Sequence, residues 1–234
     1  MLPLEKLLAR NLGCSRAEAR ALLAREGSDL PRAIAPADLP YTVPLLGGRS
    51  ITLRDSFHLM LHKPVGCVTA LADRTHPTAL RYLAQAPLMA ELRPVGRLDL
   101  DTTGLLTWTT DGEWLHRLTH PRNAIPRSYH AGLARPFAPL PANLVLHDGH
   151  RPNVLDLRPA RADEMHPGLH RPADALAFAT ITIGGGAYHE IRRIFAALGS
   201  HVVSLCRVSF GEWNLPTDLA PGGWREVARE VMEG

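Results

Sequence analysis

The sequence predicts an α+β protein in which a mixed, largely antiparallel sheet carries a few flanking helices, preceded by a small N-terminal unit. Strand-like segments outnumber helical ones and do not alternate with them as βαβ units would. The chain also opens with two short helical patterns and then a proline-rich stretch. With 234 residues, we expect one large domain and a small appendage.

The N-terminal unit is predicted from its helix signals. Leucines recur at helical spacing through Leu4–Leu12, and Ser15–Glu18 has the form of a capping box that begins a second helix. Arg16 and Arg20 lie four residues apart and therefore share one helix face. That face either contacts RNA phosphates or is simply solvated.

The connection to the main domain is marked by four prolines within residues 30–44, which indicate a connector or an irregular strand. We expect the boundary near residues 45–57, with the first unit at 1–50 and the main domain at 55–234. In the main domain, strands are expected at 57–61, 105–109, 144–146, 175–183 and 201–210, helices at 113–120 and 188–198, and a surface loop at 159–172.

Charge gives a mild preference for anionic partners. The 26 basic and 23 acidic residues leave a net charge of +3, and the only lysines are Lys6 and Lys63. Arginine suits bidentate contacts to phosphate, although a GC-rich genome would enrich it equally. No carboxylate occurs between Glu113 and Asp148, so this stretch should carry a positive potential.

Several classes of protein and site are disfavoured. Cys14, Cys67 and Cys206 are isolated, which favours a reduced, cytoplasmic compartment over a disulfide framework. No uncharged apolar run approaches 18 residues, so we expect no membrane span. His116 and His120 have the spacing of metal ligands, but no further ligand cluster accompanies them, and no phosphate-binding glycine loop is present. We expect neither a metal nor a cofactor.

The densest group of polar residues lies between Arg93 and Gly104, directly before an apolar strand. Asp99 and Asp101 in this group are either a carboxylate pair that performs chemistry or turn residues that bind backbone amides. A buried carboxylate stays ionised when an arginine is close to it. Arg192 or Arg193, far along the chain, can serve as that partner.

Together these motifs resemble the pseudouridine synthases of the RsuA/RluB type. The resemblance rests on Gly96–Asp99, Thr103–Leu106 and Thr110–Gly112, with support from Lys63–Gly66, His189–Gly199 and Val203–Arg207. It covers most of residues 57–234. The segment Leu4–Glu26 is similar to the S4-type (alpha-L) RNA-binding module that these enzymes often carry, although no clear strand and turn of that module follows Gly27.

The resemblance implies roles for individual residues. Asp99 would be the catalytic aspartate, Tyr129 the active-site tyrosine, Arg192 the ion-pair partner of Asp99, and Leu205 an apolar wall beside the uracil. Further substrate contacts are expected from Arg97, Arg193, Arg127, Arg207 and Lys63. The chain departs from the family pattern in having Arg127 where lysine is usual and Glu190 where glutamine is usual.

The implied reaction isomerises a uridine in RNA to pseudouridine without a cofactor or a metal. Asp99 would either attack the sugar or assist glycal formation. Residues 101–104 and 218–222 favour the branch of the family that acts on 16S rRNA of the small ribosomal subunit, as free RNA or in an assembling 30S particle. Modification of 23S rRNA and a noncatalytic role in RNA binding or ribosome assembly are the alternatives. We expect a monomer.

Overall fold

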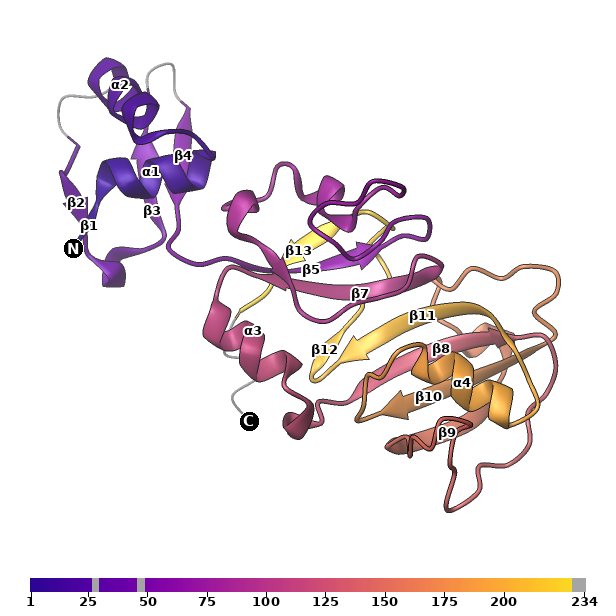
Figure 1. The fold of residues 1–234 in the computed structure, drawn as a ribbon. Helices are drawn as coiled ribbons and strands as arrows, with labels where there is room; N and C mark the ends of the chain where they lie inside the picture. Colours follow the sequence, from indigo (N-terminus) through magenta and orange to yellow (C-terminus); the bar gives the residue numbers. More distant parts are fainter. Residues whose placement is uncertain (27–29, 46–48, 229–234) are drawn as a thin grey trace.

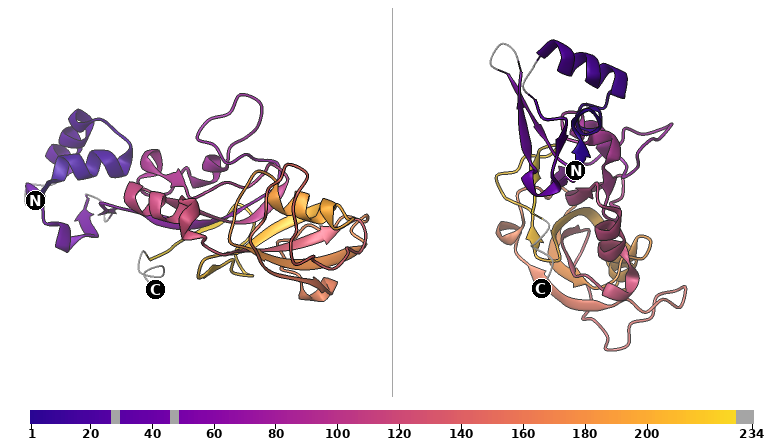
Figure 2. Two further views of the ribbon diagram at one scale, coloured as in Figure 1. Left: turned by 60° about the horizontal axis from the view of Figure 1, so that its bottom comes forward. Right: turned by 90° about the vertical axis from the view of Figure 1, so that its left-hand side faces the viewer.

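The computed structural model describes residues 1–26, 30–45 and 49–228, which form a small N-terminal unit beside a larger unit built on one long sheet (Figure 1). Both further views place the N-terminal unit at one end of the molecule (Figure 2). The larger unit carries the site described below.

The N-terminal unit has its own core. Leu7, Leu8 and Ala19 from its two helices pack with Val43 and Leu53 from a hairpin, all buried. The predicted capping box is present, because Glu18 N donates to Ser15 Oγ and Ser15 N donates to Glu18 Oε2. Its elements are β1 (Leu2–Pro3), α1 (Leu4–Leu12), α2 (Arg16–Glu26), β2 (Ala33–Ile34), β3 (Tyr41–Pro44) and β4 (Ser50–Leu53).

The larger unit confirms the predicted sheet. Within the described residues, nine strands join in the order β13-β5-β7-β11-β8-β10-β9, with β12 beside β11 and β6 beside β7. The β7–β11 pair is parallel and the other pairs are antiparallel. The elements are β5 (His58–Lys63), β6 (Arg93–Pro94), β7 (Thr102–Thr109), α3 (Gly112–Thr119), β8 (Arg127–Leu133), β9 (Val154–Ala160), β10 (Ala177–Ile183), α4 (Glu190–Ala197), β11 (Val202–Phe210), β12 (Trp213–Asn214) and β13 (Trp224–Glu226), with 3₁₀ turns at 79–83, 89–91, 121–123 and 162–164.

The sheet separates two cores because neighbouring strand residues point to opposite faces. On β7 and β11, Leu106 and Leu205 belong to the core that α4 covers, whereas Leu105 and Cys206 belong to the core that α3 covers. Burial raises the pKa of the Cys206 thiol to about 12. Cys206 is therefore a packed core residue.

Three expectations differ from the structure. Residues 144–146 form no strand, and the edge strand of this region is β9, ten residues later. The stretch 159–172 begins within β9 and buries Met165 and Leu169, so it is not simply a surface loop. The stretch 30–44, expected to be a connector or an irregular strand, contributes β2 and β3 to the N-terminal unit, and β4 pairs with β3 and carries this unit through residue 53.

Candidate active site

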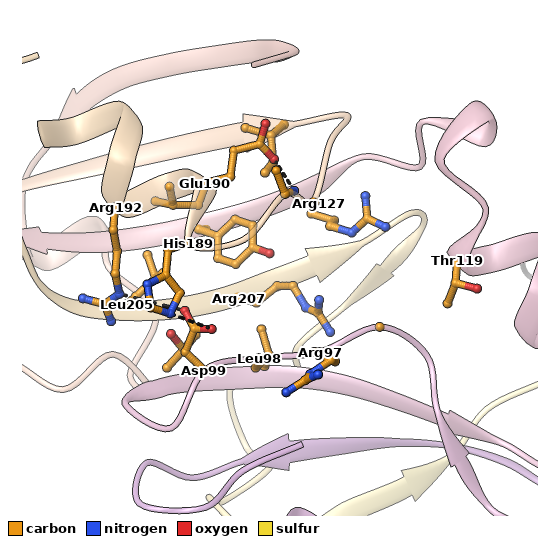
Figure 3. Close-up of a pocket in the computed structure, with 17 residues that line it drawn as sticks. Arg97, Leu98, Asp99, Thr119, Arg127, His189, Glu190, Arg192, Leu205 and Arg207 are labelled. Carbon is orange, nitrogen blue, oxygen red and sulfur yellow. Dashed lines mark hydrogen bonds and ion pairs between the residues drawn. The ribbon is translucent and has the colours of Figure 1, made fainter. Parts of the chain in front are cut away.

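A cavity of about 300 Å³ opens between the 96–99 loop, the strands β8 and β11, and the start of α4 (Figure 3). Of the sequence-predicted site residues in the larger unit, most line it. They are Arg97, Asp99, Arg127, Tyr129, Arg192, Leu205 and Arg207. Segments that are more than one hundred residues apart in the chain thus meet at one place.

The loop that carries Asp99 is held by backbone hydrogen bonds. Leu98 N donates to Thr69 Oγ1 and the same hydroxyl donates to Leu98 O, each at 3.0 Å. Gly66 N donates to Leu100 O at 2.8 Å, which ties the loop to the turn after β5. Because the backbone on both sides of Asp99 is fixed, the position of its carboxylate is set before any substrate binds.

An imidazole and a guanidinium group face the Asp99 carboxylate. His189 Nε2 lies 3.5 Å from Oδ1, and Arg192 Nε lies 3.9 Å from Oδ2 (Figure 3). Arg192 makes a much closer ion pair with Asp101, at 2.7 Å between Nη2 and Oδ1. The expected partner of Asp99 is therefore present but shared, and its shorter contact goes to Asp101.

The sequence analysis assigned no role to His189. It lies directly before α4 in a left-handed backbone conformation with φ of 49°, which a residue other than glycine or asparagine rarely adopts. Its ring stacks on Tyr188 with centroids 3.8 Å apart. The sequence could have indicated His189, because residues three apart at the start of a helix lie on the same side, and Arg192 was already expected to pair with Asp99.

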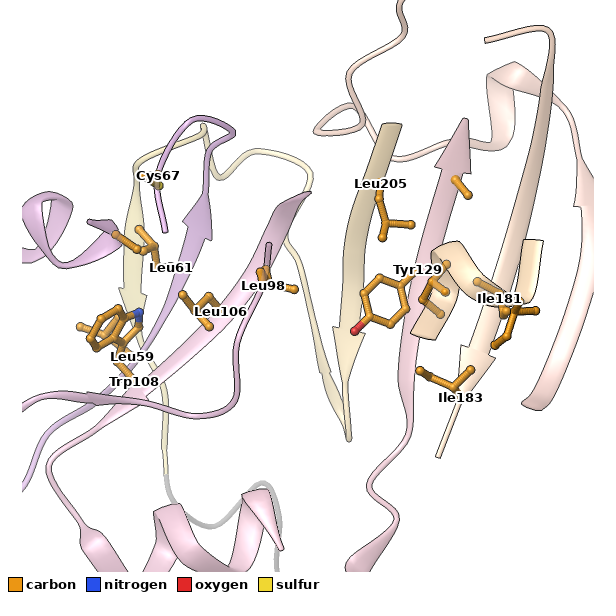
Figure 4. Close-up of a cluster of buried hydrophobic side chains, with 14 of the residues drawn as sticks. Leu59, Leu61, Cys67, Leu98, Leu106, Trp108, Tyr129, Ile181, Ile183 and Leu205 are labelled. Carbon is orange, nitrogen blue, oxygen red and sulfur yellow. The ribbon is translucent and has the colours of Figure 1, made fainter. Parts of the chain in front are cut away.

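An apolar slot lies beside the carboxylate. The side chain of Tyr129 on β8 is placed between Leu205 and Ile183, and Tyr129 is only 7% exposed (Figure 4). Leu98 and Ile191 also line the cavity. Flat apolar walls beside one carboxylate are suited to a planar base attached to a sugar.

The opposite end of the cavity is basic. Arg207 is 1% exposed, and its Nε donates to Leu105 O at 2.7 Å. Arg127 Nη1 donates to Ile125 O at 3.0 Å and to Gly185 O at 2.5 Å. Burial lowers the pKa of the Arg127 guanidinium, and the charge of Arg207 acts in the same direction.

Two predicted substrate contacts are not in the cavity. Lys63 has no exposed surface, and its Nζ donates to Pro64 O and Thr102 O at 3.0 and 2.7 Å, so it fixes the start of β7. Burial lowers the pKa of this ammonium group. Arg193 forms an ion pair with Asp148 instead of lining the cavity, because its place on α4 directs it away from Asp99.

The carboxylate of Glu190, which stands where the family usually has glutamine, has its own hydrogen-bond partners. It is buried, it accepts a hydrogen bond from Ala187 N at 2.9 Å, and its Oε1 lies 2.8 Å from His150 Nε2. The Glu190 carboxylate therefore contacts the backbone turn at Ala187 and the His150 ring. In the described part of the chain, no three histidine, cysteine or acidic side chains are grouped so as to hold a metal ion.

Comparison with known proteins identifies the family of the chain. The model of the RNA pseudouridylate synthase family matches residues 57–197, and the chain belongs to this family. It is therefore an RNA-modifying isomerase, and the resemblance noted in its motifs is confirmed.

Named relatives match over nearly the whole chain. The ribosomal small subunit pseudouridine synthase A of Escherichia coli K12 is 36% identical over 235 residues, covering 98% of this chain and 97% of the relative. The protein of the same name from Yersinia pestis is 34% identical, covering 98% and 96%. A crystal structure of a pseudouridylate synthase is similar with a TM-score of 0.60 and 27% identity, covering 99% of this chain and 98% of the other.

Proposed function

We propose that the protein converts one uridine of 16S rRNA in the small ribosomal subunit to pseudouridine. The relatives named above support the small-subunit target. The observation that carries the proposal is the Asp99 carboxylate at the edge of an apolar slot, facing His189 and Arg192.

The proposed reaction begins with a uridine that leaves its base stack, which costs a few kcal/mol. Its uracil enters the slot between Tyr129 and Leu205, and Asp99 then meets the sugar. The N1–C1′ bond breaks, the base turns, and a C5–C1′ bond forms; the proton of C5 is lost and N1 gains one. Asp99 acts either as a nucleophile at C1′ or as a base that assists glycal formation, and Tyr129 stacks on the base.

The N-terminal unit is proposed to bind RNA. Arg16 and Arg20 are exposed on α2, as the spacing predicts, but Arg20 also pairs with Glu5 at 2.5 Å. This ion pair offsets part of the positive charge, so Arg16 is the better candidate for a phosphate contact. We further propose that the enzyme acts as a monomer in the cytoplasm; no helix among the described residues is long and apolar enough to cross a membrane.

The test compares Asp99→Asn with Asp101→Asn in cells that lack the gene. Both variants remove one carboxylate from the same loop, but only Asp99 faces the slot. Pseudouridine is labelled with carbodiimide and read as reverse-transcription stops on both ribosomal RNAs. We expect one small-subunit stop to be restored by wild type, restored at least in part by Asp101→Asn, and not restored by Asp99→Asn.

Other outcomes separate the alternatives. A missing stop in 23S rRNA would keep the chemistry and move the target. Restoration by Asp99→Asn would contradict its catalytic role and favour a noncatalytic RNA-binding factor. The affinity of purified Asp99→Asn for RNA should stay within a few-fold of wild type, because the carboxylate acts on the reacting sugar and not on the phosphates.

A further inference from the structure

The basic end of the cavity holds an unusual pair of guanidinium groups. Arg127 and Arg207 lie over the same ring, Phe210, with their Cζ atoms 5.1 and 5.3 Å from its centroid. In Figure 3 both lie with Arg97 on the side away from Asp99, His189 and Arg192. The three arginines come from the 96–99 loop, β8 and β11.

This pair has backbone partners but no anion. Among the described residues, the hydrogen bonds of Arg127 and Arg207 all go to carbonyl oxygens, and Nη2 of Arg207 is buried without any partner. Among the described residues, no carboxylate lies within ion-pair distance of these two arginines or of Arg97. Glu190, which also lines the cavity, is bound to His150 and to Ala187 N.

Two like charges, one buried and one half-buried, are costly to keep together without a counter-charge. A bound anion would remove this repulsion and satisfy the free Nη2 of Arg207. Guanidinium groups form paired hydrogen bonds with phosphate oxygens. When the base of a nucleotide is held in the slot, only the ribose separates it from the nucleotide's phosphates, so a phosphate lies near the slot. The cavity volume of about 300 Å³ is suited to a single nucleotide.

We propose that Arg127 and Arg207, with Arg97 at the rim, bind a backbone phosphate next to the target uridine, at the end of the cavity opposite Asp99. This inference rests on the proposed function, because it takes a uridine in RNA as the substrate. The two ends of the cavity then have different roles: Asp99 reacts with the sugar, and the arginines bind the phosphate of the flipped nucleotide.

The first test is a nuclear magnetic resonance titration of the full-length protein, read at the Nε–H of Arg207. This proton is buried and donated to Leu105 O, so it should exchange slowly enough to be observed. Uridine, uridine 5′-monophosphate, uridine 3′-monophosphate and inorganic phosphate are added separately. We expect one of the monophosphates to shift the signal and to bind at least tenfold more tightly than uridine, which identifies the phosphate concerned.

Equal binding of uridine and both monophosphates, with no shift at Arg207, would overturn the proposal. Equally tight binding of inorganic phosphate and the nucleotides would also overturn the proposal, because it would show that the arginines bind an adventitious ion only. The proposed function can fail in cells without changing this titration, because the titration does not depend on which RNA is modified.

The second test uses Arg97→Gln, which changes an exposed side chain and should fold. The salt dependence of RNA binding should lose about one unit of slope relative to wild type, because one phosphate contact is weakened. Arg161→Gln is the matched control: Arg161 is exposed, pairs with Asp163, and does not line the cavity. Equal slopes for Arg97→Gln and Arg161→Gln would remove Arg97 from the phosphate site.

Discussion

At the scale of single residues, the site depends on how one arginine is shared between two carboxylates. Arg192 lies 2.7 Å from Asp101 but 3.9 Å from Asp99, whereas His189 approaches Asp99 to 3.5 Å. Asp101 therefore holds Arg192 in place, and the His189 imidazole lies nearer than Arg192 to the reacting carboxylate. Both His189 and Asp99 are about one-third exposed, so water weakens their attraction.

A change at His189 tests this arrangement. His189→Gln should lower the single-turnover rate by at most about fivefold, since a polar contact between two side chains that are one-third exposed contributes at most about 1 kcal/mol. RNA affinity should stay within about twofold, because the imidazole faces the carboxylate. Tyr188→Ala is the control, as it removes the stacked ring and keeps the imidazole. A loss seen in affinity alone would contradict the assignment of His189 to Asp99.

At the scale of elements, the parallel pair β7–β11 brings Arg207 to the cavity. The two strands lie close together at Gly104, where φ is +113° and an added Cβ would lie 2.3 Å from Arg207 O. Only glycine permits both this backbone conformation and this approach. The glycine that follows Thr102–Thr103 in the motif therefore serves the site by setting the spacing of the strands.

Gly104→Ala should consequently destabilise the protein by about 3 kcal/mol, from the strained φ and the overlap with the backbone of β11. Urea unfolding measures the free energy. Gly112→Ala, at the first residue of α3, meets nothing within 4 Å and should leave stability unchanged or slightly higher. Equal stabilities of the two variants would show that β7 and β11 can separate without cost.

Three histidines lie close together at β8: His130 on the strand is half-buried, and His62 and His166 are buried. His166 N donates to His130 Nδ1 at 2.8 Å, and the His62 and His166 rings are 6.1 Å apart. Burial, followed by the nearby charge of His166, lowers the pKa of His130 to about 4, and burial also lowers the pKa of His62 and of His166. The folded protein keeps these rings neutral where the unfolded chain would take up protons.

Stability should therefore be greatest above about pH 6.5 and fall as the pH drops toward 4. For His130 alone, the loss between pH 7 and pH 5 is about 2 kcal/mol. Urea unfolding of wild type and His130→Gln at both pH values checks this: the variant should lose less stability on acidification. His147→Gln, at an exposed position, should behave like wild type. Parallel losses in all three proteins would contradict the prediction.

At the scale of the whole molecule, polar contacts join the N-terminal unit to the larger unit. Arg10 lies 2.6 Å from Asp55 Oδ1 and 2.8 Å from Glu91 Oε1. Asn11 exchanges two hydrogen bonds with the backbone of Arg54, at 2.9 and 3.0 Å. Because the two cores are separate, these contacts govern where the N-terminal unit lies relative to the cavity.

Arg10→Ala should loosen this junction. The partly exposed ion pairs of Arg10 contribute about 1 kcal/mol, so their loss should make the junction open about fivefold more often. Trypsin should then cut the chain after Arg54 about fivefold faster. Arg20→Ala removes an ion pair within the N-terminal unit and should leave cleavage at Arg54 unchanged. Identical cleavage rates for wild type and Arg10→Ala would show that the hairpin and Asn11 suffice to hold the junction.

Short-range patterns in the sequence predicted the class of fold and carried the resemblance to the family. That resemblance implied one site for Asp99, Tyr129, Arg192 and Leu205, and all four line the cavity. Capping boxes, alternating strands and a contiguous motif are local properties that a sequence displays directly. The hairpin β3–β4 was missed because short strands become stable only through pairing with a neighbour. The edge strand β9 was missed because it runs into the stretch 159–172, which was expected to be a loop.

The tertiary structure decided which basic side chains serve the site. Lys63, Arg193 and His189 each occur in motifs near Asp99 or Arg192, but spacing does not show what each side chain contacts. Folding directs Lys63 to carbonyl oxygens, Arg193 to Asp148 and His189 to Asp99. It also places Arg127 and Arg207 over one ring, although they are 80 residues apart. Contacts between side chains that are far apart in the sequence depend on how distant strands and helices pack together, and local sequence patterns do not show this.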